Sequence, residues 1–95
     1  KIYAHWCGHC KDLIDTMKFL ATELKPHEFK VGAINLALDK NKKNKFLNNN
    51  VIGFPTLFFV NPIDGKLLEY NDSREKYSIL DNISTYVEKI IQELD

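Results

Sequence analysis

Two cysteines separated by two residues stand between a short apolar run and a stretch that favours a helix. The apolar run is Ile2-Tyr3-Ala4, and the helical stretch begins at Lys11, directly after the segment Trp6-Cys7-Gly8-His9-Cys10. Positions i and i+3 on a first helical turn are neighbours, so Cys7 and Cys10 can close a short disulfide. The order of these features predicts a strand, a redox-active cysteine pair and a helix in direct succession.

The two thiols are not expected to be equivalent. Cys7 stands where a helix presents free N–H groups and the positive end of its dipole, both of which stabilise a thiolate. Cys10 lies one turn further on and is followed by core-facing Leu13 and Ile14. We therefore expect Cys7 to be the nucleophile and Cys10 to be the more buried, resolving thiol.

Two other uses of the pair stay open at this stage, a structural disulfide bridge and half of a zinc site. Zinc would need two further ligands, for which the chain offers His5, His9 and His27. The position of the pair between a strand and a helix favours redox chemistry. We expect no bound metal and no organic cofactor.

The composition allows one modest core and argues against several classes of partner. The chain has 95 residues, 44% of them hydrophobic, and no linker rich in Gly, Ser or Pro, so we expect a single domain over residues 1–95. Its thirteen basic and thirteen acidic side chains balance, which removes the usual electrostatic case for a nucleic acid or an anionic membrane. No apolar run approaches the ~20 residues that a membrane span needs.

The hydrophobic pattern predicts a parallel β-α-β unit followed by a short helix, a β-hairpin and a long helix. An Asn cluster over 48–50 is typical of a turn. The expected elements are, in chain order, a strand over 1–4, a helix over 7–24, a strand over 29–36, a helix over 40–47, strands over 56–60 and 66–70, and a helix over 72–94.

Both long helices show an apolar stripe that we expect to be buried. In the first helix the stripe consists of Leu13, Met17, Leu20, Ala21 and Leu24. In the last helix Asp72 and Glu75 have the spacing of a capping pair. The stripe of that helix consists of Tyr77, Leu80, Ile83, Val87, Ile90, Ile91 and Leu94.

Two motifs of the chain are Tyr3-Ala4-His5-Trp6-Cys7-Gly8-His9-Cys10-Lys11-Asp12-Leu13 and Gly53-Phe54-Pro55-Thr56. Both resemble motifs of protein disulfide isomerase domains in the thioredoxin superfamily. The resemblance implies a thioredoxin-like α/β fold, in which a mixed sheet of a parallel β-α-β unit and a β-hairpin is flanked by helices. It also implies that the N-terminal strand-helix-strand portion of such a domain is absent and that the chain is part of a longer one.

The resemblance assigns roles to residues around the cysteines. His9 would stabilise the Cys7 thiolate and so favour the reduced form, the alternative being a solvent-exposed bystander. Arg74 lies in a segment like the one whose arginine can approach the second cysteine, the alternative being a surface arginine at a helix start. The expected catalytic residues are Cys7, Cys10, His9 and Arg74.

The second motif resembles a loop that holds a cis-proline facing the disulfide. Pro55 would then be cis, the alternative being a trans proline that opens a strand. A cis bond would place the backbone of Phe54 and Ile52 beside the first cysteine, where it could pair with an extended substrate. Together with Trp6 and Gly53, these residues form the expected substrate-binding set.

Three residues depart from the family pattern. Lys1 stands where the family usually has Glu or Asp as a proton acceptor for the second cysteine, and a buried, neutral amine could still take a proton from Cys10. If the end of the chain frays, Lys1 has no role. Asp15 replaces a helix-kinking proline and predicts a straighter helix. His5 replaces another proline, and both a surface role and a place at the rim of the site stay open.

The resemblance implies a thiol-disulfide oxidoreductase and isomerase that acts through Cys7 and Cys10. Its substrates would be unfolded or partly folded proteins that contain cysteines, and glutathione or an upstream thiol oxidase would be its redox partner. The implied location is the lumen of the endoplasmic reticulum. Two alternatives stay open, a thioredoxin-like disulfide reductase and a peptide-binding or chaperone module with weak redox activity.

Overall fold

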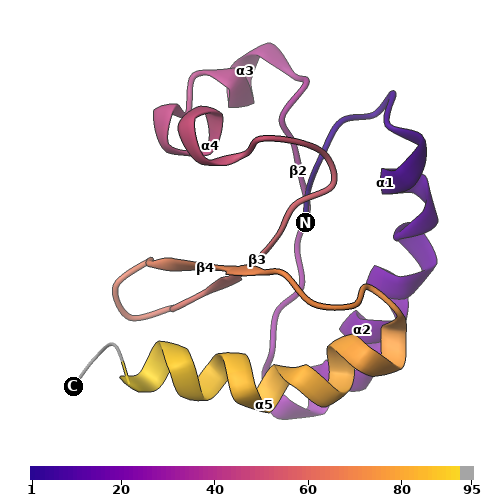
Figure 1. Cartoon of the computed structure of the whole chain (residues 1–95), viewed down its shortest axis with the longest axis vertical. Helices are drawn as coiled ribbons and strands as arrows, with labels where there is room; N and C mark the ends of the chain where they lie inside the picture. The colour runs from indigo at the N-terminus through magenta and orange to yellow at the C-terminus, as the bar shows by residue number, and fades with distance from the viewer. Residues whose placement is uncertain (93–95) are drawn as a thin grey trace. The chain divides into compact units, whose positions relative to one another are not determined.

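The computed structural model describes residues 1–92, and contacts divide the chain into two compact units, Lys1–Thr56 and Leu57–Asp95 (Figure 1). The first unit contains β1 (Ile2–Tyr3), α1 (Gly8–Asp12), α2 (Ile14–Leu24), the 3-10 helix η1 (Lys25–His27), β2 (Ile34–Asn35), α3 (Asp39–Lys42) and α4 (Lys45–Asn50). The second contains β3 (Leu57–Val60), β4 (Leu67–Tyr70) and α5 (Lys76–Gln92). Among residues 1–92, no helix is both long enough and apolar enough to span a bilayer.

Strand β1 has a hydrogen-bonded neighbour on both edges. On one edge it pairs in parallel with β2, with Ile2 opposite Ile34. On the other edge Ile2 and Thr56 exchange two backbone hydrogen bonds, with N···O distances of 2.8 and 3.0 Å. The parallel β-α-β unit predicted from the sequence is therefore confirmed, and β1 ends directly before the cysteine segment.

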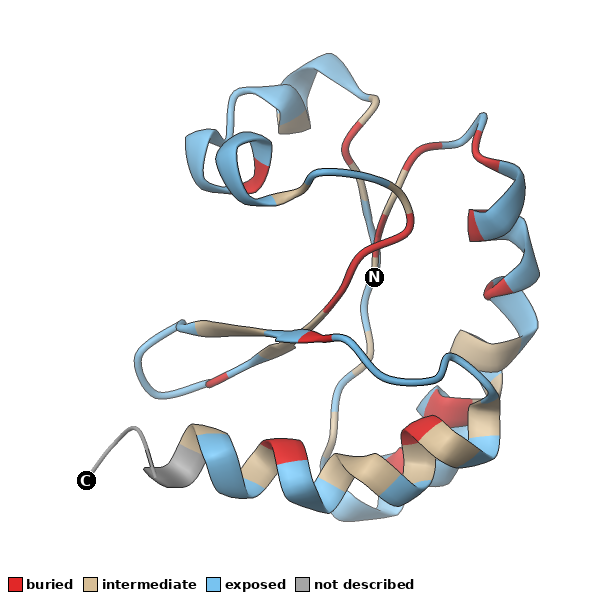
Figure 2. Cartoon of the chain, viewed as in Figure 1, coloured by how far each residue is buried: buried red, intermediate tan, exposed pale blue. Residues whose placement is uncertain are grey.

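Strand β2 is shorter and more exposed than the buried strand predicted over 29–36. It comprises only Ile34–Asn35, and the side chain of Ile34 is 40% exposed, whereas Leu36 is buried (Figure 2). The strand is short because its partner β1 has only two residues. Among residues 1–92 no strand pairs with the other edge of β2.

The single helix predicted from Cys7 to Leu24 is two helices, interrupted at Leu13. The N–H of Leu13 donates to the carbonyl of Cys10 at 3.3 Å, a 3-10 type bond that tightens the turn. The interruption precedes Asp15, and the straighter helix expected from Asp15 stays a prediction. Of the predicted stripe, Leu13, Leu20 and Leu24 are buried, Met17 is half-buried and Ala21 is exposed.

The polar helix predicted over 40–47 is also two helices, α3 and α4. Asn44 separates them because its side-chain oxygen accepts the N–H of Leu47 at 3.0 Å and so caps the start of α4. The predicted turn over 48–50 is wrong, since these asparagines form the last turn of α4. There the side-chain amide of Asn50 donates to the carbonyl of Phe46 at 2.8 Å.

The predicted β-hairpin is confirmed in the second unit. Strands β3 and β4 are antiparallel, from Leu57 opposite Tyr70 to Val60 opposite Leu67. The turn closes with Gly65 at a φ of 74°, a left-handed conformation that glycine adopts without a steric penalty. Figure 1 shows the hairpin and the long helix α5, which contacts β4.

Helix α5 begins later than predicted and is capped by a different carboxylate. Glu75 Oε2 accepts the N–H groups of Tyr77 and Ser78, both at 3.0 Å. Asp72 makes no cap, because its Oδ2 instead accepts the hydroxyl of Tyr86 at 2.7 Å. The helix therefore starts at Lys76 rather than at Asp72.

The buried face of α5 is rotated from the predicted stripe. Its most buried side chains are Ile79 and Tyr86, each 5% exposed, and neither was predicted. Tyr77, which was predicted to be buried, is 57% exposed. The side chain of Ile91 and the whole of Leu94 lie outside the described residues.

Replacing Glu75 by glutamine should weaken the start of α5 and reduce the acid sensitivity of the fold. The two backbone hydrogen bonds from Tyr77 and Ser78 hold the pKa of Glu75 below its ordinary value of 4.5. A lowered folded-state pKa contributes stability above the unfolded-state pKa, and this stability is lost as the pH falls through the folded-state pKa. Circular dichroism during acid titration should show a smaller loss of helix for E75Q than for the wild type.

The matched control for this prediction is E88Q, which changes an exposed glutamate of the same helix. We expect E88Q to follow the wild-type acid titration. Identical pH dependence of E75Q and the wild type would contradict the capping role of the Glu75 carboxylate.

Candidate active site: a buried cysteine pair at the start of a helix

Cys7 and Cys10 are free thiols at the beginning of α1. Cys7 immediately precedes the helix, and its Sγ accepts the backbone N–H of Cys10 at 3.2 Å, so the sulfur itself caps the helix. Cys10 is 2% exposed and Cys7 is 8% exposed (Figure 2). The prediction that Cys10 is the more buried thiol is confirmed. The local structure also places a backbone donor on the sulfur that we expect to act as the nucleophile.

The surroundings of Cys10 hold its sulfur in the protonated form. Burial is the main cause that raises the pKa of the Cys10 thiol, and the hydrogen bond and charge of Cys7 raise it further. A backbone hydrogen bond at Ala4 and the positive charge of Lys1 act in the opposite direction without cancelling the effect. A thiol that ionises reluctantly does not compete with Cys7 for substrate, which suits a resolving cysteine.

A small apolar cluster surrounds the two sulfurs. Cys7 and Cys10 are buried together with Ala4 from the end of β1, and Tyr3, Ala37 and Phe54 pack against them. The cluster thus joins β1, α1, the segment after β2 and the loop before β3. These contacts fix the cysteines against three other parts of the first unit.

The loop that contains Phe54 reaches the cysteines as the second motif implied. The Phe54–Pro55 peptide bond is cis, and Pro55 is buried. Thr56 anchors the loop from both sides, because its hydroxyl donates to the carbonyl of Gly53 at 2.7 Å while its backbone pairs with Ile2. Thr56 is the last residue of the second motif, but its spacing gave no sign of this anchoring role.

Two aromatic rings and one aliphatic side chain are presented around this loop. Trp6 is 66% exposed and meets Phe54 edge to face, with ring centroids 5.6 Å apart. Ile52 is fully exposed. Trp6 and Phe54 are therefore brought together beside the cysteines, while the expected contact of Ile52 with substrate stays a prediction.

Among the described contacts, His9 makes no bond to either thiol. The His9 side chain is 89% exposed, and its Nδ1 lies 3.9 Å from Asp12 Oδ2. Arg74 follows β4 in the second unit and is exposed. The roles of His9 at Cys7 and of Arg74 at Cys10 stay predictions.

His5 is held by a residue that sequence analysis did not identify. The Asn35 side chain accepts the N–H of Ala37 at 3.0 Å through its oxygen, so its amide nitrogen faces His5 Nδ1 at 3.1 Å. The ring nitrogen must then accept, which places the proton of a neutral ring on Nε2. No local signal points to Asn35, because the contact joins β2 to the turn that follows β1.

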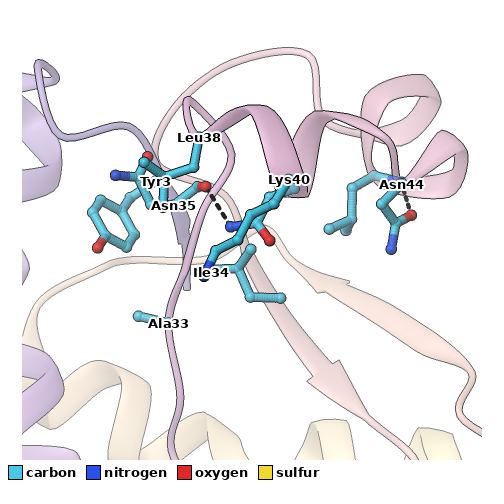
Figure 3. A pocket seen from close by; sticks show the side chains of 9 residues that line it. Tyr3, Ala33, Ile34, Asn35, Leu38, Lys40 and Asn44 are labelled. Carbon is cyan, nitrogen blue, oxygen red and sulfur yellow. Dashed lines mark hydrogen bonds between the residues drawn. The ribbon is translucent and has the colours of Figure 1, made fainter.

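A separate hollow of about 470 Å³ lies in the first unit between the β1–β2 pair and the helices α3 and α4 (Figure 3). Tyr3, Ile34 and Asn35 line it from the strands, and Leu38, Lys40 and Asn44 line it from the segment that follows. Neither cysteine is among its lining residues. It is not part of the cysteine site.

Within residues 1–92, no three or more His, Cys, Asp or Glu side chains gather where they could share one metal ion. The zinc alternative considered for the cysteine pair therefore gains no support from the arrangement of its neighbours.

The family model described as Thioredoxin matches residues 1–85, which include both cysteines and the cis-proline loop. The chain belongs to the thioredoxin family. The structure combines a parallel β1–β2 pair, an antiparallel hairpin and helices. This combination agrees with the thioredoxin-like α/β fold expected from the sequence.

Several curated proteins of this family are similar to nearly the whole chain. A protein disulfide-isomerase A6 homolog of Caenorhabditis elegans is 34% identical over 91 residues, which are 96% of this chain and 20% of that protein. A protein disulfide-isomerase of Zea mays is 39% identical over 83 residues, 87% of this chain and 15% of that protein. Protein disulfide isomerase-like 1-4 of Arabidopsis thaliana is 36% identical over 92 residues, 96% of this chain and 14% of that protein. The chain thus spans a fifth or less of these relatives.

Proposed function

We propose that this thioredoxin-family chain is a thiol-disulfide oxidoreductase of the protein disulfide isomerase type, which forms and rearranges disulfides in protein substrates. One observation carries the proposal: two buried free thiols lie one turn apart at the start of α1, and the first sulfur caps the helix. The names of the similar proteins give independent support. No metal or organic cofactor enters the chemistry.

Disulfide formation begins from the oxidised pair. A substrate thiolate attacks Cys7 Sγ, the Cys7–Cys10 bond breaks, and Cys10 leaves as a thiolate that takes up a proton. A second substrate thiolate then attacks the substrate sulfur of the mixed disulfide and releases Cys7. Two electrons pass from the substrate to the protein, which ends as a dithiol.

Disulfide rearrangement begins from the reduced pair. The Cys7 thiolate attacks a wrong substrate disulfide and releases one substrate thiolate, which can attack another sulfur of the same substrate. If the rearrangement stalls, Cys10 attacks Cys7 Sγ and releases the substrate. The protonated, buried state of Cys10 supports this order, because Cys10 reacts only after Cys7 holds a substrate.

The surroundings of the pair suggest how a substrate is held. The exposed Trp6 ring and the half-buried Phe54 ring offer an apolar surface next to Cys7, suited to an unfolded or partly folded chain. In this proposal the domain works in the lumen of the endoplasmic reticulum, and glutathione or an upstream thiol oxidase restores its disulfide. His9 stabilises the Cys7 thiolate, and Arg74 approaches Cys10.

Equilibration in graded glutathione buffers tests the proposal. The fractions of Cys7–Cys10 disulfide and dithiol are measured by mass after acid quenching and alkylation. A reduction potential of about −180 mV would support an isomerase, whereas a potential of about −270 mV would make the chain a thioredoxin-like reductase. The variant C10S is the control, because it can form only a mixed disulfide with glutathione.

A further inference from the structure

The side-chain ammonium of Lys1 lies at the end of the helix that carries both cysteines. Its Nζ is 3.5 Å from the carbonyl oxygen of Cys10, which also accepts the N–H of Leu13 at 3.3 Å. The same Nζ lies 5.0 Å from the ring centroid of Tyr3. The ammonium is therefore held between β1 and the C-terminal end of α1, where the helix dipole favours a cation.

The positive charge of Lys1 acts on the Cys10 thiol and lowers its pKa. Its charge favours the ionised form of the buried sulfur, against the effects of burial and of Cys7. In a partly buried site such a charge is less screened than at the surface. Lys1 thus combines a fixed position at the Cys10 backbone with a direct electrostatic effect on the Cys10 side chain.

Among the described residues, the other ionisable groups near Cys10 do not combine a contact with its backbone and a charge that favours its thiolate. The backbone nitrogen of Lys1 donates to the carbonyl of Gly32 at 2.9 Å, in the segment before β2. On α1 itself, His9 and Asp12 are 89% and 81% exposed, and Lys11 is exposed. The segment after β2 and the loop before β3 contribute only Ala37 and Phe54 to the cluster. The ionisable members of the cluster itself are Tyr3, Cys7 and Cys10.

We propose that the Lys1 ammonium is a positioning residue for the resolving step, in which it stabilises negative charge on the Cys10 sulfur. The proposal rests on the proposed function and concerns the same site. Cys10 first loses its proton to the solvent. Its thiolate then forms a bond to Cys7 Sγ, the bond between Cys7 and the substrate sulfur breaks, and the substrate leaves as a thiolate with the electron pair.

In this role Lys1 stays charged and neither donates nor accepts the proton. The proposal therefore differs from the sequence-based expectation of a neutral amine that takes the proton from Cys10. A cation lowers the free energy of the thiolate, whereas a neutral amine would only move its proton. The two mechanisms predict different effects of replacing Lys1 by arginine, which cannot be deprotonated in proteins.

Three variants separate the charge of Lys1 from its hydrogen bond. K1Q removes the charge but keeps a donor for the Cys10 carbonyl, K1M removes both, and K1R keeps both. Each reduced protein is mixed in stopped flow with a disulfide of a chromogenic aryl thiol. Cys7 binds one aryl thiol, and the slower release of that thiol by Cys10 is followed by absorbance as a function of pH.

We expect K1Q and K1M to release the aryl thiol more slowly than the wild type by roughly threefold to tenfold at neutral pH, because losing the cation raises the pKa of the Cys10 thiol. Their pH midpoints should therefore rise, and their rates should reach the wild-type plateau at alkaline pH. K1R should follow the wild type. Circular dichroism establishes that each variant is folded.

Three outcomes would overturn the proposal. The profile of K1Q could coincide with that of the wild type while K1M is slow, which would assign the effect to the hydrogen bond. The variants could be slower by one constant factor at every pH, which would indicate a structural role. K1R could behave like K1M, which would favour the neutral amine. If the wild type released no more aryl thiol than C10S, the proposed function itself would fail.

Discussion

The variant C10S should lose all turnover while it still forms covalent complexes with substrate. Its Cys7 keeps its place as the cap of α1 and can attack a substrate disulfide, but no second thiol remains to release the mixed disulfide. Non-reducing gels of C10S with a disulfide-containing protein should show a trapped complex that a reductant dissolves. Steady-state disulfide reduction should fall to the background rate measured without protein.

The variant C7S is the matched control for this experiment, because it retains one thiol in the same helix. Cys10 is 2% exposed, and its pKa is raised mainly by burial, so it should not replace Cys7 as a nucleophile. C7S should therefore trap no complex and should also be inactive. Trapping by C7S and not by C10S would show that the roles of the two cysteines are reversed.

Serine at position 10 brings a hydroxyl into a buried cluster, so stability must be checked separately. An unpaired buried hydroxyl costs about 1–3 kcal/mol. C10A removes the thiol without adding a polar group, and it should trap substrate as C10S does. Agreement between the two variants would show that trapping reflects the missing thiol rather than a loosened fold.

The local features of this chain were predictable because their causes lie close together in the sequence. The cysteine spacing predicted the start of α1 and the more buried second thiol, and both are present. The hairpin followed from two apolar runs around a turn that ends in Gly65. The cis form of Pro55 came only from the resemblance to a family, since most prolines are trans.

The errors arise where a distant residue competes for a local group. Asp72 and Glu75 have the spacing of a capping pair, but Tyr86 takes the Asp72 carboxylate from farther along the chain. Glu75 alone is left to cap α5, and the helix starts later. The sequence around Asp72 carries no sign of this bond, because the bond exists only once helix and hairpin have packed.

The same reasoning applies to the cysteine site. The hydrogen bond between Asn35 and His5 joins β2 to the turn after β1, and the contact of Lys1 with the Cys10 carbonyl joins the residue before β1 to α1. Residue type and spacing identified the sulfurs, whereas tertiary packing selects which polar side chains reach them. Sequence reasoning therefore identified the reacting atoms better than the groups that adjust them.

The variant Y86A should be strongly destabilising, because the Tyr86 ring joins all three elements of the second unit. The ring stacks on Phe59 of β3 at a centroid distance of 5.0 Å and an angle of 15°, and it lies 5.0 Å from Tyr70 of β4. It is 5% exposed. Removing a buried aromatic ring costs about 3–5 kcal/mol. Urea unfolding should show this loss as a lower midpoint with an unchanged slope.

The variant Y86F separates the ring from its hydroxyl. The hydroxyl donates to Asp72 at 2.7 Å and accepts the N–H of Asn71 at 3.2 Å. The bond to Asp72 is the main cause that raises the pKa of Tyr86, so the hydroxyl stays a donor. Losing these bonds while keeping the stacked ring should cost about 1–3 kcal/mol.

The exposed tyrosine of the same helix supplies the control. Tyr77 is 57% exposed, so Y77A removes the same side chain from α5 with much less loss of buried area. Its effect should stay below about 1 kcal/mol, as for most surface substitutions. If Y86A and Y77A cost the same, Tyr86 would not be what holds α5 to the hairpin. If Y86F cost as much as Y86A, the hydrogen bonds rather than the stacked ring would hold the helix in place.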